Sequence, residues 1–121
     1  MRIMFDLMGT VFGAIDMSLR PGIKETIKAL RENGCQVGFW TSGPVEQYRA
    51  VLNGAGITGE VYRKGVHLPF VPDICVDDSP EEWMPGELFA VKPHISDVMP
   101  GVSILVAELM GFNEKRNFFR D

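Results

Sequence analysis

The chain has 121 residues, of which 45% are hydrophobic and 23% are charged, and its formal net charge is −4. This length and composition are typical of one soluble globular domain and argue against a disordered chain. The acidic balance argues against nucleic acid as a partner, because nucleic-acid binding requires a basic face. A local basic pocket for a single phosphate is still compatible with it.

The sequence also argues against membrane and secreted classes. We expect no signal peptide, because the apolar run after Arg2 stops at Asp6. No apolar run approaches the roughly 18 residues that span a bilayer. Cys35 and Cys75 stand beside apolar residues in predicted strands, which favours two reduced core thiols over a disulfide. We therefore expect a cytoplasmic protein.

Short apolar runs, each followed by polar or turn residues, predict five strands. A run that is apolar throughout and ends on a polar residue is typical of a buried parallel strand. The predicted strands are residues 2–5, 35–40, 60–64, 73–76 and 88–91.

Helical periodicity predicts three helices, over residues 23–33, 44–53 and 102–110. Gly34 suits the position after the first helix. We expect residues 11–19 to form a loop or small hairpin flap, and a turn or helical segment to begin at Ser79 and run through Trp83.

The order β-α-β-α-β-β-β-α predicts an α/β fold, a three-layer Rossmann-like sandwich with a mainly parallel central sheet. No linker or repeat interrupts it, so residues 1–121 are interpreted as one domain. In open sheets of this kind, ligands bind at the carboxyl ends of the strands.

Polar residues stand at those ends: Asp6, Thr41, Ser42, Asp77 and Asp78. Carboxylates that converge on one edge repel each other unless a cation lies among them, and hard oxygen ligands suit Mg²⁺. Hydroxyl and free N–H groups nearby can hold a phosphate. Structural roles are the alternative: Asp6, Asp77 and Asp78 as turn residues, and Thr41 or Ser42 as the N-cap of the following helix.

Three ordered segments resemble the motifs of the haloacid-dehalogenase-like (HAD-like) superfamily. FDLMGT resembles the first motif, hhhDxDGT, in which h is apolar; GFWTSG resembles the second, and VDDSP the fourth, acidic motif. The fourth is similar to that of the small phosphatases that act on the polymerase C-terminal tail. RPGIKETIKALRENG resembles the segment between the first two motifs, so the resemblance covers roughly residues 2 to 92.

The resemblance implies a Mg²⁺-dependent phosphohydrolase or phosphotransferase. Asp6 would attack phosphorus and form an aspartyl-phosphate. Mg²⁺ would be held by Asp6, by the backbone carbonyl of Met8, and by Asp77 or Asp78.

The same resemblance implies the phosphate-binding groups. Thr41 and the N–H of Ser42 would bind a phosphoryl oxygen, and Gly9 and Thr10 belong to the same phosphate site. A lysine would steady the phosphate. Lys64 is preferred because it falls between the second and fourth motifs, whereas Lys92 follows the fourth; a solvated surface position for Lys64 is the alternative.

Met8 departs from the family pattern, because phosphatases of the family place a general acid and base Asp there. A thioether cannot donate or usefully accept a proton, and such help is typically worth about 10²–10⁴ in rate. Three interpretations follow: a leaving group that needs no proton, such as that of an acyl phosphate, an anhydride or an aryl phosphate; another donor, such as Asp16 or the substrate; or a non-catalytic binding module. We expect an enzyme that is slow on simple monoesters.

No cap domain is expected, because few residues separate Thr10 from Pro21. An open site favours a macromolecular phosphorylated substrate or closure by another subunit of a homo-oligomer, and the sequence does not choose between them. A response-regulator receiver domain would combine similar residues, but its acidic pair follows the first strand and its nucleophile the third.

Overall fold

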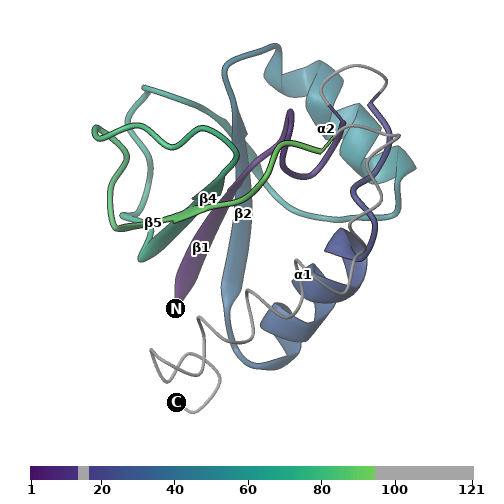
Figure 1. Cartoon of the computed structure of the whole chain (residues 1–121), viewed down its shortest axis with the longest axis horizontal. Helices are drawn as coiled ribbons and strands as arrows, with labels where there is room; N and C mark the ends of the chain where they lie inside the picture. The colour runs from purple at the N-terminus through teal and green to yellow at the C-terminus, as the bar shows by residue number, and fades with distance from the viewer. Residues whose placement is uncertain (14–16, 95–121) are drawn as a thin grey trace.

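The computed structural model describes residues 1–13 and 17–94 (Figure 1). Within them the chain forms seven elements: β1 (Arg2–Asp6), α1 (Ile23–Glu32), β2 (Gln36–Thr41), α2 (Val45–Gly54), β3 (Val61–Arg63), β4 (Ile74–Asp77) and β5 (Glu87–Ala90). All pairings between these strands are parallel, and the sheet order is β3-β2-β1-β4-β5.

The predicted α/β order is confirmed over this part of the chain. Each predicted strand, and each of the first two predicted helices, agrees with an observed element to within one residue at either end. Residues 79–83 form turns and bends without a helix. The helix predicted over residues 102–110 lies outside the described residues.

The central strands β1 and β4 are covered on both faces, which explains why they are apolar nearly throughout. Successive side chains point to opposite faces of a strand. In β1, Phe5 belongs to the main hydrophobic core and Met4 to a second, smaller cluster on the other face. The central position of β1 brings its carboxyl end between those of β2 and β4.

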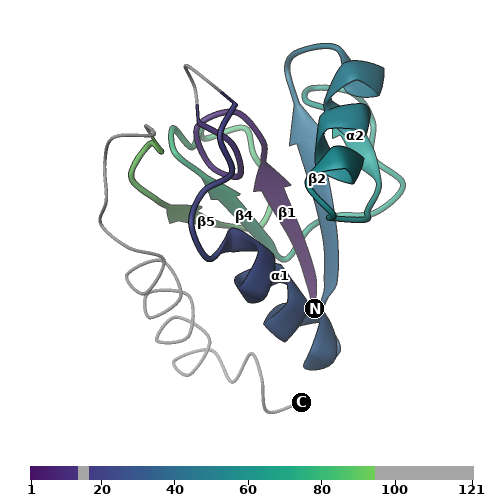
Figure 2. The same cartoon turned by 90° about the vertical axis from the view of Figure 1, so that its right-hand side faces the viewer.

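Both described helices lie on the same face of the sheet (Figures 1 and 2). In α1, Ile23, Ile27 and Leu30 are buried in the main core, which accounts for the helical spacing of these residues. The helix ends at Glu32, and Gly34 follows with a φ of 86°, a left-handed conformation that favours glycine.

The opposite face of the sheet is covered by the β3–β4 and β4–β5 connections, which lie to the left in Figure 1. Trp40, Cys75 and Met84 are buried there with Met4, and Leu68 and Phe70 pack against them. Over the described residues the predicted three layers are therefore a helical layer, the sheet and a layer of irregular loops.

The predicted flap between β1 and α1 is partly described. Phe12 forms an antiparallel bridge with Leu19, and the N–H of Gly13 donates to the carbonyl of Ser18 at 2.7 Å. Residues 14–16, which include Asp16, lie outside the described residues.

Both cysteines, Cys35 and Cys75, are buried free thiols, as predicted. Among the described residues, the helices are too short and too polar to cross a membrane.

Candidate functional site

Three adjacent strands end in polar side chains that meet at one edge of the sheet. Asp6 ends β1, Thr41 ends β2 and Asp77 ends β4, and all three side chains are buried. Because β1 pairs in parallel with both β2 and β4, these ends lie side by side. The convergence predicted from the strand ends is therefore present.

Lys64 joins this group from the turn directly after β3. Its N–H donates to the carbonyl of Thr41 at 2.9 Å, which holds the residue beside the end of β2. Its Nζ lies 2.8 Å from Asp6 Oδ1 and 2.8 Å from Asp77 Oδ2. Lys64 is thus an ion-pairing group inside the site, and the surface alternative is wrong. Lys92 lies elsewhere: it is exposed, and its carbonyl accepts a hydrogen bond from Arg20.

Asp78 is the third carboxylate of the acidic cluster, and the hydroxyl of Thr10 contacts the cluster. Asp6, Asp77 and Asp78 each present an oxygen within 4.8 Å of the others. The Thr10 hydroxyl lies 3.2 Å from Asp6 Oδ2 and 3.3 Å from Asp78 Oδ1. The Thr10 hydroxyl therefore lies between the carboxylates of Asp6 and Asp78, which would otherwise repel each other.

The electrostatics of the cluster favour a proton or a cation. Burial raises the pKa of Asp6 from 3.8 to about 7, and the hydrogen bond with Asp78 adds to the rise, while Lys64 opposes it. Burial by itself lowers the pKa of Lys64, but hydrogen bonds with Asp6 and Asp77 outweigh it, so that the pKa is raised and the ammonium persists.

Gly9 makes room for the cluster. It has a φ of 88°, and a Cβ at this position would lie 2.6 Å from Asp78 Oδ2. Its N–H donates to the carbonyl of Phe12 at 2.6 Å, and the N–H of Thr10 donates to that of Leu7 at 3.3 Å. Both amides are thus engaged within the turn, which favours a role for Gly9 and Thr10 in shaping the site over direct contact with phosphate.

The hydroxyl of Thr41 does not cap α2. It accepts a hydrogen bond from the N–H of Gly43 at 3.0 Å, while the N-cap position is Pro44, without a side-chain cap. The N-cap alternative for Thr41 and Ser42 is therefore wrong. Both residues line the open space in front of the acidic cluster.

Asp77 is both a turn residue and a member of the acidic cluster, so the two roles predicted as alternatives are present together. Its Oδ1 accepts a hydrogen bond from the N–H of Ser79 at 2.8 Å, which stabilises the turn after β4. Its Oδ2 faces Lys64 in the site.

The space in front of the cluster is a cavity of about 370 Å³. Met8 lines it and is 43% exposed, and its Sδ lies 4.0 Å from the hydroxyl of Tyr48. Asp6, Asp78 and Glu81 also line this cavity.

Sequence reasoning missed Tyr48 and Glu81 as site residues. Tyr48 contacts Met8 only because of how α2 packs against the sheet, which no local pattern shows. Glu81 lies in a connection without periodicity, so no local signal identified it. His94 is buried outside this cavity, and its Nε2 lies 3.1 Å from the Ser18 hydroxyl.

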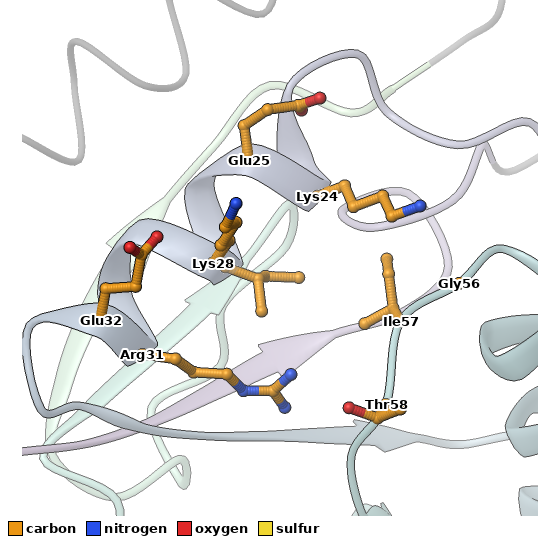
Figure 3. Close-up of a pocket in the computed structure, with 9 residues that line it drawn as sticks. Lys24, Glu25, Lys28, Arg31, Glu32, Gly56, Ile57 and Thr58 are labelled. Carbon is orange, nitrogen blue, oxygen red and sulfur yellow. The ribbon is translucent and has the colours of Figure 1, made fainter.

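Another cavity, of about 630 Å³, lies away from the acidic cluster, between α1 and residues 56–58. Figure 3 shows Lys24 and Arg31 reaching across it toward this segment, while Glu25 and Glu32 point away. Its lining mixes both charges, and Ile57 stands between the two cations. It contains no group of convergent carboxylates, and we place the candidate chemistry at the acidic cluster instead.

Comparisons with known proteins do not assign a family. A scan against protein-family models, a search of curated proteins and a search of solved structures each found no match. The resemblance to the HAD-like superfamily therefore depends on this chain's own motifs.

Proposed function

We propose that the protein is a capless HAD-like phosphohydrolase or phosphotransferase that depends on Mg²⁺ and acts through an aspartyl-phosphate on Asp6. The observation that carries the proposal is the position of Lys64 Nζ, 2.8 Å from both Asp6 and Asp77 beside a third carboxylate. A nucleophile, a cation site and a phosphate-steadying ammonium are the groups that such a reaction needs.

The donor set fits Mg²⁺ in its chemistry. Asp6, Asp77 and Asp78 supply hard carboxylate oxygens, and the backbone carbonyl of Met8 would add a neutral oxygen. The raised pKa of Asp6 indicates that the cluster holds too much negative charge for its burial. Bound Mg²⁺ would offset this charge and reduce the repulsion between an anionic phosphate and an anionic nucleophile.

The chain's own residues then have distinct roles. Asp6 forms a bond to phosphorus as the bond to the leaving oxygen breaks, and that oxygen keeps the electron pair. Thr41 and the N–H of Ser42 would bind a phosphoryl oxygen, and Lys64 would hold the phosphate while keeping Asp6 oriented. Water or another acceptor finally takes the phosphoryl group, and Asp6 is regenerated.

Met8 determines which substrates can react. It lines the cavity where a proton donor would be expected and offers none. Loss of general acid help costs about 10²–10⁴ in rate, so we propose slow turnover of simple alkyl monoesters. Phosphorylation of Asp6 by an acyl phosphate, whose leaving group needs no proton, would be affected least.

Incubation with acetyl phosphate and Mg²⁺, followed by intact-mass analysis and peptide mapping, tests the proposal. We expect one phosphoryl group on Asp6, no labelling in Asp6→Asn, and normal labelling in the control Asp73→Asn. Asp73 is an exposed carboxylate outside the cavity. The proposal would be refuted if folded wild-type protein is not labelled and does not bind beryllium fluoride, a mimic of the phosphoryl group.

A non-catalytic binding module is the second candidate, and Met8 is the observation that favours it. This module would show no Mg²⁺ binding in calorimetry and no phosphatase activity after Met8→Asp. Activity gained by Met8→Asp would show that the other groups of the site are competent and would exclude this alternative.

A further inference from the structure

A second hollow, of about 370 Å³, lies on the sheet face opposite the helices. We call it the tryptophan hollow, and its lining includes Trp40, Val66, Leu68, Phe70, Val71 and Trp83. Trp83 is 48% exposed and Val71 is 70% exposed. Large apolar side chains left open to water beside a hollow are typical of a binding surface.

The tryptophan hollow lies next to the candidate phosphate site, and residues of the two linings contact each other. Gly65 and Val66, which line it, directly follow Lys64. Lys64 Nζ lies 5.9 Å from the centre of the Trp40 ring, within the range of a cation–π contact.

A second connection runs through the β4–β5 loop. Glu81 lines the phosphate cavity, and its carboxylate accepts a hydrogen bond from Trp83 Nε1 at 2.7 Å. The rings of Trp40 and Trp83 are 5.6 Å apart. Residues that line the hollow thus contact residues that line the phosphate cavity at two points.

The indole N–H of Trp40 is a buried donor without an acceptor. Trp40 is only 2% exposed, and its Nε1 has no hydrogen-bond partner within residues 1–13 and 17–94. An unpaired buried donor costs free energy, so this indole N–H would be satisfied by an acceptor that reaches it when a ligand binds. The two rings that line the hollow, rather than this donor, favour an aromatic ligand.

From these observations we infer that the substrate is a phosphate monoester of an aryl alcohol, whose ring lies in the tryptophan hollow beside Trp40 and Trp83. The inference rests on the proposed function and specifies its substrate class. Ring stacking and apolar burial would supply the binding energy.

The inferred substrate class also suits the absence of a proton donor at Met8. As Asp6 bonds to phosphorus, the bond between phosphorus and the aryl oxygen breaks, and the electron pair leaves with a phenolate. A phenol has a pKa near 10, as in tyrosine, which is far below that of an alkyl alcohol, so the phenolate leaves unprotonated and takes its proton from solvent. Water then hydrolyses the aspartyl-phosphate to inorganic phosphate and free Asp6.

Binding can be measured without turnover by using phosphonates, which lack the scissile oxygen. The chain has two tryptophans, Trp40 and Trp83, and both line the hollow, so intrinsic fluorescence reports its occupancy. With Mg²⁺ present, we expect 2-naphthylphosphonate to bind at least ~10-fold more tightly than methylphosphonate, the gain from burying one aromatic face. Calorimetry gives the affinity of the methyl compound.

Substitutions at exposed positions test whether the hollow binds the aryl group without disturbing the fold. Trp83→Ala and Val71→Asp, both at exposed positions, should remove most of the ~10-fold preference, and Trp83→Phe should restore it. Leu88→Ala is the matched control, because Leu88 is an exposed apolar residue that does not line the hollow. Acetyl phosphate labelling of Asp6 should be unchanged in the control Leu88→Ala, which lies outside both linings.

Equal affinity for the two phosphonates, or a preference that survives both Trp83→Ala and Val71→Asp, would overturn the inference. If Asp6 is labelled but no aryl preference exists, only the substrate class fails. If the preference exists but Asp6 is never labelled, the hollow binds aryl groups and the proposed function fails. Free phosphotyrosine and a phosphotyrosine peptide, compared in the same assay, distinguish a small aryl phosphate from a protein side chain.

Discussion

The substitution Asp6→Asn should make the metal-free protein more stable at pH 8. The pKa of Asp6 is raised by burial from 3.8 to about 7. The folded state therefore binds this proton more tightly than the unfolded state, so the stability contributed by the proton is complete below about pH 4 and is lost as the pH rises to about 7.

The size of the effect follows from the same values. One pKa unit corresponds to about 1.4 kcal/mol, so a rise from 3.8 to about 7 corresponds to at most about 4 kcal/mol. Asparagine is nearly isosteric with protonated aspartate and does not ionise. We expect the free energies of unfolding of wild type and Asp6→Asn to be similar at pH 4.5 and to differ by about 2–4 kcal/mol at pH 8, in favour of the variant.

Urea unfolding in EDTA at several pH values measures this difference, and Asp73→Asn controls for the loss of one carboxylate elsewhere. Adding Mg²⁺ at pH 8 should then stabilise wild type more than Asp6→Asn, because only wild type keeps all the carboxylates of the cluster. Parallel pH profiles for wild type and Asp6→Asn would refute the reasoning, since they would show that burial does not destabilise ionised Asp6.

Three further predictions concern the turn after β1 and the sheet core. Met8→Asp should raise the rate on an alkyl phosphate by about 10²-fold or more, measured by phosphate release; an unchanged rate would show that a missing proton donor is not the limitation. Gly9→Ala should destabilise the fold and weaken Mg²⁺ binding, because its Cβ would contact Asp78. Gly65 has a similar φ of 78° with open space around it, so the control Gly65→Ala should lower the free energy of unfolding in urea by only about 1 kcal/mol. Equal effects of the two substitutions would argue against the contact with Asp78. The Cys75 thiol, whose pKa is raised by burial to about 11, should react with a disulfide reagent at pH 8 only after urea is added; rapid reaction of the native protein would contradict its burial.

Local sequence signals were sufficient to predict the elements of the described region. β1 and β4 are buried on both faces, and such strands are continuous apolar runs with clear ends. Gly34 follows α1 and Gly56 follows α2 in left-handed conformations, which only glycine adopts readily. The placement of both described helices on one face could not be predicted from any single run, because it depends on the order of strands in the sheet.

The site was predictable where it depended on strand ends and unpredictable where it depended on turns. Asp6 and Asp77 end neighbouring parallel strands, so their meeting follows from the sheet order. The ion pairs of Lys64 depend on a β3 of only three residues, and the family resemblance, rather than periodicity, suggested that lysine. The amides of Gly9 and Thr10 turn inward through hydrogen bonds that no sequence pattern revealed.

The energetics of Asp6 argue that the cluster is not there to stabilise the fold. A strand end can carry any polar side chain that reaches water, yet this chain buries a carboxylate beside two others, and its raised pKa shows that ionisation costs stability. Thr10 and Lys64 accommodate that carboxylate by a hydrogen bond and an ion pair, and Gly9 leaves room for the neighbouring Asp78 because it has no Cβ. Groups that destabilise a fold and are surrounded by such compensations are expected at functional sites. The arrangement therefore favours a chemical role for Asp6 over a structural one, and under the proposed function Met8 would limit which leaving groups that chemistry can use.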